Sequence, residues 1–189
     1  MAVMLDYIGS YVIGGMILLI LFNVNSSVQT ASSENLYAGI MQKSVTTAAE
    51  IIEYDAYKIG YRVSGNKFSL ADSNAVKFQA DLDDNGTAET VHYYCGNTAG
   101  LTSTSNPNDF ILNREINSQK PGAQILVSNF VITYFDSLGQ VLNYAALTNQ
   151  SEMNKIRSIK FNLKCESDEL IDGAYEAAEW EKIILPKNI

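Results

Sequence analysis

The chain has 189 residues, of which 47% are apolar and 18% are charged, which suffices for one modest domain with its own core beside an apolar N-terminal segment. Asp and Glu number 21 against 13 Lys and Arg, a net charge of -8, and no basic cluster occurs. This charge pattern excludes the usual nucleic-acid-binding classes, so we expect no nucleic-acid partner.

The N-terminal segment is apolar over residues 7–22 and carries one carboxylate, Asp6, just before that run. Residues 3–22 are long enough to cross a hydrocarbon core of about 30 Å as a helix, with Asp6 at the water interface or paired. The first basic residue is Lys43, so the segment lacks the positively charged start of a secretory signal. We therefore expect a membrane helix rather than a cleaved signal.

Small residues interrupt this apolar helix at Gly9, Ser10, Gly14 and Gly15. Glycine weakens an isolated helix in water, whereas in membranes small residues let neighbouring helices approach closely. We therefore predict that these four residues, together with Asp6, form an assembly surface for further copies of the chain or for related subunits.

A helical spacing of apolar residues continues as far as Ile59, and no proline occurs before Pro107. This pattern predicts a single helix over residues 3–61, about 85 to 90 Å long, that a Ser-Gly-Asn sequence at 64–66 ends. The polar residues 23–35 are poor in strong helix formers. They are expected to be the most pliable part of the helix or, alternatively, a disordered linker.

Beyond residue 67 the pattern changes to short runs rich in Val, Ile, Tyr, Phe and Thr between turn residues, which is typical of strands. The main runs are AVKFQADL (75–82), AETVHYYC (88–95), SNFVITYFD (128–136), QVLNYAAL (140–147) and IRSIKFNLKCE (156–166), and DFILNREI (109–116) is a shorter one inside a long surface loop. The tail is compatible with a short helix or a last strand.

The predicted fold class is α+β, with the C-terminal half of the long helix packed on an antiparallel sheet of four to six strands. Three parts follow: a transmembrane and assembly helix (1–23), its amphipathic continuation (24–63) and a globular β domain (64–189). The long loop around residues 95–125 is the expected place for contacts with a partner.

Cys95 and Cys165 are the two cysteines, and no zinc, redox or haem spacing is present. A disulfide between them would stabilise a domain outside the cytoplasm by about 4 kcal/mol. We predict this bond, between the ends of two strands, and two reduced thiols are the alternative.

An acidic turn, DLDDNG, follows the first main strand and matches the first half of a calcium loop, with oxygen-bearing residues at alternate positions. The second half does not match, because His92 stands where the bidentate Glu belongs. Two interpretations remain open: a calcium site made by Asp81, Asp83, Asn85 and Glu89, or a solvated hairpin turn without a cofactor.

Catalysis is not expected. His92 is the only histidine and lies in an alternating strand pattern, so a nucleophile would have no second histidine as its base.

The order of these elements resembles that of type IV pilins and of the pseudopilins of type II secretion. EIIEYDAYKIGYRVSG (50–65) is similar to the helix end of W-type minor pilins and J-type pseudopilins, in which an Asp, a basic residue and Gly-Tyr close the helix; here these are Asp55, Lys58, Gly60 and Tyr61. VKFQADLDDNGTAETVHYY (76–94) resembles the acidic hairpin of those families, and the later strand runs resemble theirs in the same order.

The resemblance implies a structural subunit that is anchored in the inner membrane before assembly and lies in a periplasmic or extracellular filament afterwards. Members of the family begin with a basic leader followed by Phe-Thr-Leu-Ile-Glu, which the sequence does not show. If Met1 is removed, Asp6 becomes the fifth residue, the place of the family's glutamate, which is thought to meet the N-terminal amine of a neighbouring subunit. For Asp6, a role as an interfacial anchor remains equally open. For the whole protein, the alternative function is a monomeric membrane-anchored binding or adhesion domain.

Overall fold

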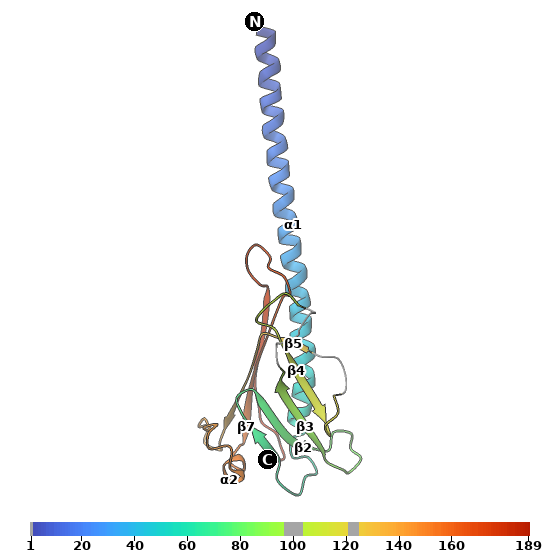
Figure 1. The fold of residues 1–189 in the computed structure, drawn as a ribbon, viewed down its shortest axis with the longest axis vertical. Helices are drawn as coiled ribbons and strands as arrows, with labels where there is room; N and C mark the ends of the chain where they lie inside the picture. Colours follow the sequence, from blue (N-terminus) through green and yellow to red (C-terminus); the bar gives the residue numbers. More distant parts are fainter. Residues whose placement is uncertain (1, 97–103, 121–124) are drawn as a thin grey trace.

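A long helix projects from a β-rich body in the computed structural model, which describes residues 2–96, 104–120 and 125–189 (Figure 1). This helix, α1 (Ala2–Tyr57), has 56 residues and is therefore about 84 Å long at 1.5 Å per residue. Its N-terminal end is the far tip of the molecule, whereas the C-terminus of the chain lies in the body (Figure 1). The predicted single long helix is confirmed.

The polar stretch in the middle of α1 is helical throughout, so the alternative of a disordered linker over residues 23–35 is wrong. Two of its polar side chains donate hydrogen bonds to backbone carbonyls one turn earlier: Ser27 Oγ to Asn23 O at 3.0 Å, and Asn35 Nδ2 to Ala31 O at 2.8 Å. These bonds give the polar side chains hydrogen-bond partners that are compatible with the helical conformation.

The helix ends at Tyr57, earlier than the apolar spacing predicts. Gly60 adopts a φ of +76°, its N–H donates to Gln79 O at 2.9 Å, and an added Cβ would lie 2.6 Å from Asn188 O. Only glycine combines this left-handed backbone with so close an approach. Gly60 therefore reverses the chain, and the predicted stop at 64–66 is wrong.

The strands form two antiparallel sheets. The first contains, in spatial order, β1 (Phe68–Ala71), β2 (Ala75–Ala80), β3 (Glu89–Cys95), β4 (Phe110–Ile116) and β5 (Ile125–Val127); the second contains β6 (Asn129–Phe135), β7 (Ser158–Glu166) and β8 (Ala177–Ile184). The α+β class with antiparallel pairing is confirmed. The described residues form eight strands in two sheets rather than one sheet of four to six.

One predicted strand is absent from its expected place. In QVLNYAAL, Val141 makes an isolated bridge to Phe135, and turns follow until the short helix α2 (Gln150–Met153). Asn143 explains the change, because its side-chain oxygen accepts from Ala145 N at 3.0 Å and closes a local turn that competes with strand pairing. The tail, which the sequence left open, forms β8.

The core lies between the C-terminal half of α1 and the sheets, with the helix packed mainly on β8 and β7. Val45, Ala48, Ile52 and Ala56 follow one another at helical spacing and are each 1% exposed. Burying a Val or Ile side chain contributes about 1.5 to 3 kcal/mol, and the alanines permit close approach of the helix to the sheet.

A buried ion pair joins α1 to the first sheet as well. Asp55 is fully buried and accepts from Arg114 Nε at 2.6 Å and Nη2 at 2.9 Å, a bidentate arrangement, and from Tyr93 Oη at 2.5 Å. The carboxylate raises the pKa of Arg114, and burial followed by the nearby Asp55 charge raises that of Tyr93. Both neighbours therefore keep their protons and hold the helix in one position on β3 and β4.

Candidate functional sites

The front half of α1 exposes its apolar side chains. Tyr11 is 79% exposed, Leu18 68% and Phe22 72%, whereas Val45 on the same helix is 1% exposed. Among the described residues this is the one helix long and apolar enough to cross a membrane. Its apolar residues lie on every side, as in helices surrounded by lipid or by other apolar helices. An apolar N-terminal helix consistent with a membrane anchor is therefore present.

The predicted small-residue positions lie on this exposed half. A Cβ added at Gly9, Gly14 or Gly15 would meet no described atom within 4 Å. At about 100° per residue, Gly14 lies about 140° around the axis from Gly9, and Gly15 another 100° further. The glycines therefore open the helix toward three directions rather than along one seam.

Asp6 is exposed near the helix tip, and its backbone carbonyl accepts from Ser10 Oγ at 2.8 Å. Ser10 thereby has a partner inside its own helix. The Asp6 carboxylate faces solvent in the isolated chain, so its predicted roles, pairing with a neighbour or anchoring at the interface, stay predictions.

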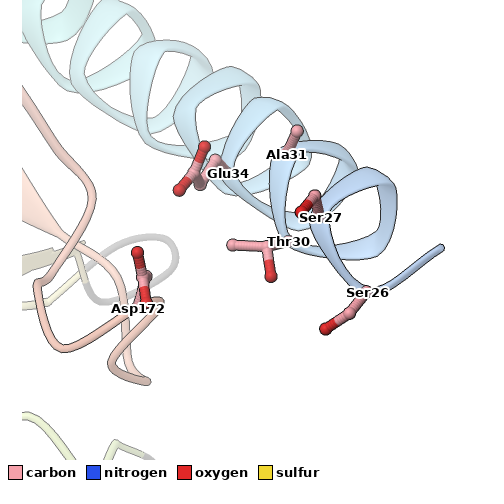
Figure 2. Close-up of a pocket in the computed structure, with 6 residues that line it drawn as sticks. All are labelled: Ser26, Ser27, Thr30, Ala31, Glu34 and Asp172. Atoms are coloured by element: carbon pink, nitrogen blue, oxygen red, sulfur yellow. The ribbon is translucent and has the colours of Figure 1, made fainter. Parts of the chain in front are cut away.

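An open polar hollow lies where the helix passes the loop between β7 and β8 (Figure 2). Its lining consists of Ser26, Ser27, Thr30, Ala31 and Glu34 from α1, with Asp172 from the loop. The carboxylate of Glu34 comes from the helix and that of Asp172 from the loop. Hydroxyl groups and like charges make this a solvated surface, which separates the apolar half of the helix from the half packed on the sheets.

The predicted disulfide is wrong in this structure, because Cys95 and Cys165 are both free. Cys95 ends β3 in the first sheet, opposite Leu112 on β4, whereas Cys165 lies on β7 in the second sheet. The Cys165 thiol instead donates to Leu126 O on β5 at 3.4 Å. Burial raises the pKa of each thiol to about 11, so both are protonated near neutral pH.

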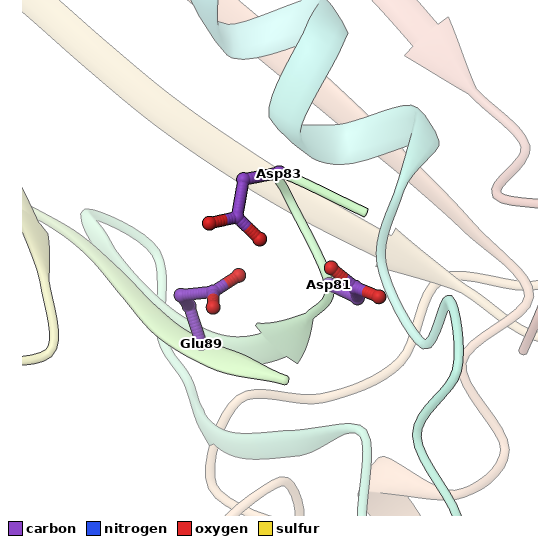
Figure 3. Close-up of side chains that lie close together, drawn as sticks. All are labelled: Asp81, Asp83 and Glu89. Carbon is purple, nitrogen blue, oxygen red and sulfur yellow. The ribbon is translucent and has the colours of Figure 1, made fainter. Parts of the chain in front are cut away.

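The acidic turn brings together three of its four predicted ligands. One carboxylate oxygen from each of Asp81, Asp83 and Glu89 lies within 4.8 Å of the others (Figure 3). The fourth, Asn85, has its side chain engaged elsewhere, since Oδ1 accepts from Thr87 N at 2.7 Å and Nδ2 donates to Asp83 Oδ2 at 2.8 Å. Asn85 therefore orients Asp83 in this structure.

Two positively charged side chains contact the acidic turn. Arg62 Nη1 lies 3.0 Å from Asp81 Oδ2, and Lys58 Nζ lies 3.2 Å from Asp84 Oδ2. Burial alone would raise the pKa of Asp81, but hydrogen bonds from Arg62 and from the Gly86 N–H hold it below its ordinary value. Asp81 is therefore charged at neutral pH.

His92 is a side chain of the first sheet, as its alternating context predicts. Its ring stacks on Tyr94 with centroids 4.5 Å apart, and Nδ1 lies 3.7 Å from Glu115 Oε2. Burial, followed by the Lys77 charge, lowers the pKa of His92, which keeps the ring neutral near pH 7.

Sequence reasoning missed the Asp55, Tyr93 and Arg114 network and the contact of Arg62 with the acidic turn. In the sequence Asp55 belongs to a stretch that resembles a helix-end motif, and its partner Arg114 is 59 residues away. A lone Asp at a core-facing position of an amphipathic helix is the signal that could have pointed to a buried cation.

The expected partner contacts of the long loop fall partly on residues 97–103 and 121–124, which lie outside the described residues. No family model, curated protein or solved structure matches this chain.

Proposed function

We propose that the protein is a structural subunit of a filament of the type IV pilus or pseudopilus kind, held in the inner membrane before assembly and bundled through its N-terminal helix afterwards. The observation that carries the proposal is the exposed apolar half of α1, which extends beyond the body, while one face of the same helix from Val45 on is buried against the body. A long apolar helix packed on antiparallel sheets is compatible with a pilin-like fold.

Exposing this half of the helix to water is unfavourable. Its exposed large side chains form a continuous apolar surface, including Ile13, Ile17 and Leu21 at 60%, 52% and 58% exposure. In a bilayer lipid covers such a surface, whereas outside the bilayer copies or related subunits must bury it. The same segment thus serves as an anchor in one state and as a packing element in the other.

The distribution of glycines favours a bundle over a simple dimer. Lipid tails are as apolar as leucine, so helix association in a membrane depends on close packing and polar contacts. Gly9, Gly14 and Gly15 permit close approach from three directions. A helix at the centre of several neighbours needs this arrangement, and a helix that only anchors a domain does not.

Imaging the protein tests the proposal. The native full-length chain, purified with whatever related subunits accompany it, should form filaments that electron microscopy resolves. Dispersed single particles under all conditions would contradict this function and favour a monomeric membrane-anchored binding domain.

Two variants test the role of the helix. Replacing Gly14 and Gly15 with Leu adds hydrophobicity, so membrane insertion should persist while close approach of neighbours is blocked. Asp6→Ala should also insert, and it should lower the amount of filament if the carboxylate pairs with a neighbour. If both variants match the parent in filament yield and subunit spacing, the helix is only an anchor.

A further inference from the structure

The acidic loop between β2 and β3 concentrates negative charge without an equivalent amount of positive charge. Three carboxylates, from Asp81, Asp83 and Glu89, converge within 4.8 Å (Figure 3). Like charges at this separation destabilise one another unless a cation lies between them. Arg62 contacts Asp81 Oδ2, and no described Lys or Arg forms an ion pair with Asp83 or Glu89.

A second, independent observation concerns Asp81 alone. Its side chain is fully buried; Oδ2 accepts from Arg62 Nη1 and from Gly86 N, at 3.0 and 2.9 Å, while Oδ1 has no partner among the described residues. Buried carboxylate oxygens are normally paired, because an unpartnered one has lost its water without compensation. A ligand beside Oδ1 would supply the missing interaction.

The loop is organised before any ligand arrives. Leu82 N donates to Glu89 Oε2 at 2.8 Å, and Asn85 Nδ2 holds Asp83 Oδ2 at 2.8 Å. Asp84 and Gly86 adopt left-handed backbone conformations, with φ of 62° and 90°, which fold the chain around the three carboxylates. The carboxylates are therefore fixed by the loop rather than free to swing apart.

The donor set identifies the class of ligand. Every converging atom is a carboxylate oxygen, and hard oxygen donors suit Ca²⁺ or Mg²⁺ rather than Zn²⁺ or Cu²⁺. Calcium–oxygen distances of about 2.3 to 2.6 Å place two ligands of one ion at most about 5 Å apart, a limit that the three oxygens satisfy. Calcium also accepts irregular sites of several protein oxygens, whereas magnesium retains most of its waters.

We propose that the loop of residues 81–89 binds one calcium ion through Asp81 Oδ1, Asp83 and Glu89, with water or loop carbonyls completing the coordination. The Asp81 side chain then bridges the ion and Arg62, because each of its oxygens has a separate partner. This site stands on the loop alone and does not depend on the filament function.

Calcium at this position stabilises the junction between α1 and the body. Leu82 O accepts from Tyr54 Oη at 2.9 Å and from Lys58 Nζ at 2.6 Å, and Asp81 N donates to Tyr61 O at 3.1 Å. The loop thus holds the end of the helix through both its backbone and its side chains. An ion that fixes the loop must also fix these contacts.

The test is thermal unfolding of the full-length chain in detergent, with EDTA or with about 10 mM CaCl₂, together with calorimetric titration of CaCl₂. A dissociation constant of about 10⁻⁴ M would raise the Tm by about 5 °C or more at that concentration. Asp83→Asn should abolish most of this rise in Tm, because it removes a proposed calcium ligand. The variant should still fold, because Asp83 is exposed and does not belong to the core.

The matched control is Asp84→Asn, which removes the same charge from the neighbouring residue outside the cluster and should retain the calcium-dependent rise. A parent Tm unchanged by calcium, with no heat of binding, overturns the proposal. An equal rise with MgCl₂ overturns the calcium assignment, and a rise that Asp83→Asn keeps or Asp84→Asn loses overturns the choice of ligands.

Discussion

Both halves of α1 carry apolar residues, yet the chain buries one face of the back half from Val45 on and leaves the front half exposed. Ile52 in the back half is 1% exposed, whereas Ile17 in the front half is 52% exposed. The back half has apolar residues on one side, polar residues on the other, and two sheets within reach. The front half is apolar on every side, and the chain offers it no partner surface among the described residues. A single helix therefore carries one half that folds the domain and another whose burial requires lipid or other subunits.

The largest expected effect comes from breaking the buried ion pair that holds the back half in place. Arg114→Gln leaves the Asp55 charge buried without its cation and should destabilise the body by about 3 to 5 kcal/mol. Chemical denaturation of the full chain in detergent measures this. Lys160→Gln is the matched control, because its pair with the half-exposed Glu181 is worth at most about 1 kcal/mol. Equal costs for the two variants would contradict the structural role of Asp55.

The second-largest effect is expected when the same Ile→Ala substitution is made in each half of α1. Ile52→Ala creates a cavity in the core and should cost about 3 kcal/mol of unfolding free energy. Ile17→Ala should change the unfolding of the body by less than about 0.5 kcal/mol, because nothing in the chain packs on it. Both values come from denaturation of detergent-solubilised protein. A large loss of body stability with Ile17→Ala would mean that the front half folds back on the domain.

The smallest effect is the loss of stability in acid. Arg62 and Gly86 lower the pKa of Asp81 despite its burial, and hydrogen bonds from Lys164, Asn108 and Asn106 do the same for Glu166. A lowered carboxyl pKa in the folded state stabilises it above the unfolded pKa, about 4, and this stabilisation is lost as the pH falls through the folded value. The body should therefore begin to lose stability below about pH 4, while the helicity of the front half in detergent persists. Circular dichroism against pH measures both, and a body most stable at pH 3 would contradict this assignment.

The long helix and most strands could be predicted from the sequence, because apolar spacing and β-branched runs are local signals. The exact helix end could not, since Gly60 and Gly65 both fit a helix stop, and the long-range contacts of Gly60 with Gln79 and Asn188 distinguish them. The strands β1 and β5 have four and three residues, too short for a periodic pattern. The division into two sheets depends on long-range pairing, which no local run encodes.

Part of the candidate metal site could be predicted from the sequence, because its ligands are close together in the chain. Asp81 and Asp83 lie in the loop before β3 and Glu89 begins β3, so their spacing alone suggests that they meet. Asn85 was expected as a fourth ligand, and local hydrogen bonds turn it to a supporting role. Two features depend on how the sheets assemble, which no local pattern encodes. One is the ion pair of Asp55 with Arg114, which the sequence does not predict. The other is the placement of Cys95 and Cys165 in different sheets, and the predicted disulfide between them is wrong.

The most direct test of the central claim is photo-cross-linking from two exposed positions, one on the front half of α1 and one on the β-rich body. Leu18 on the front half and Leu138 on the turn after β6 are 68% and 81% exposed, so a photoreactive amino acid at either position leaves the body folded. In membranes or filaments that contain the assembled protein, cross-linking from position 18 should yield dimers and higher oligomers, whereas position 138 should yield far fewer. Cross-links from position 18 to lipid alone, with no oligomer, would contradict the claim that other subunits bury the front half of α1.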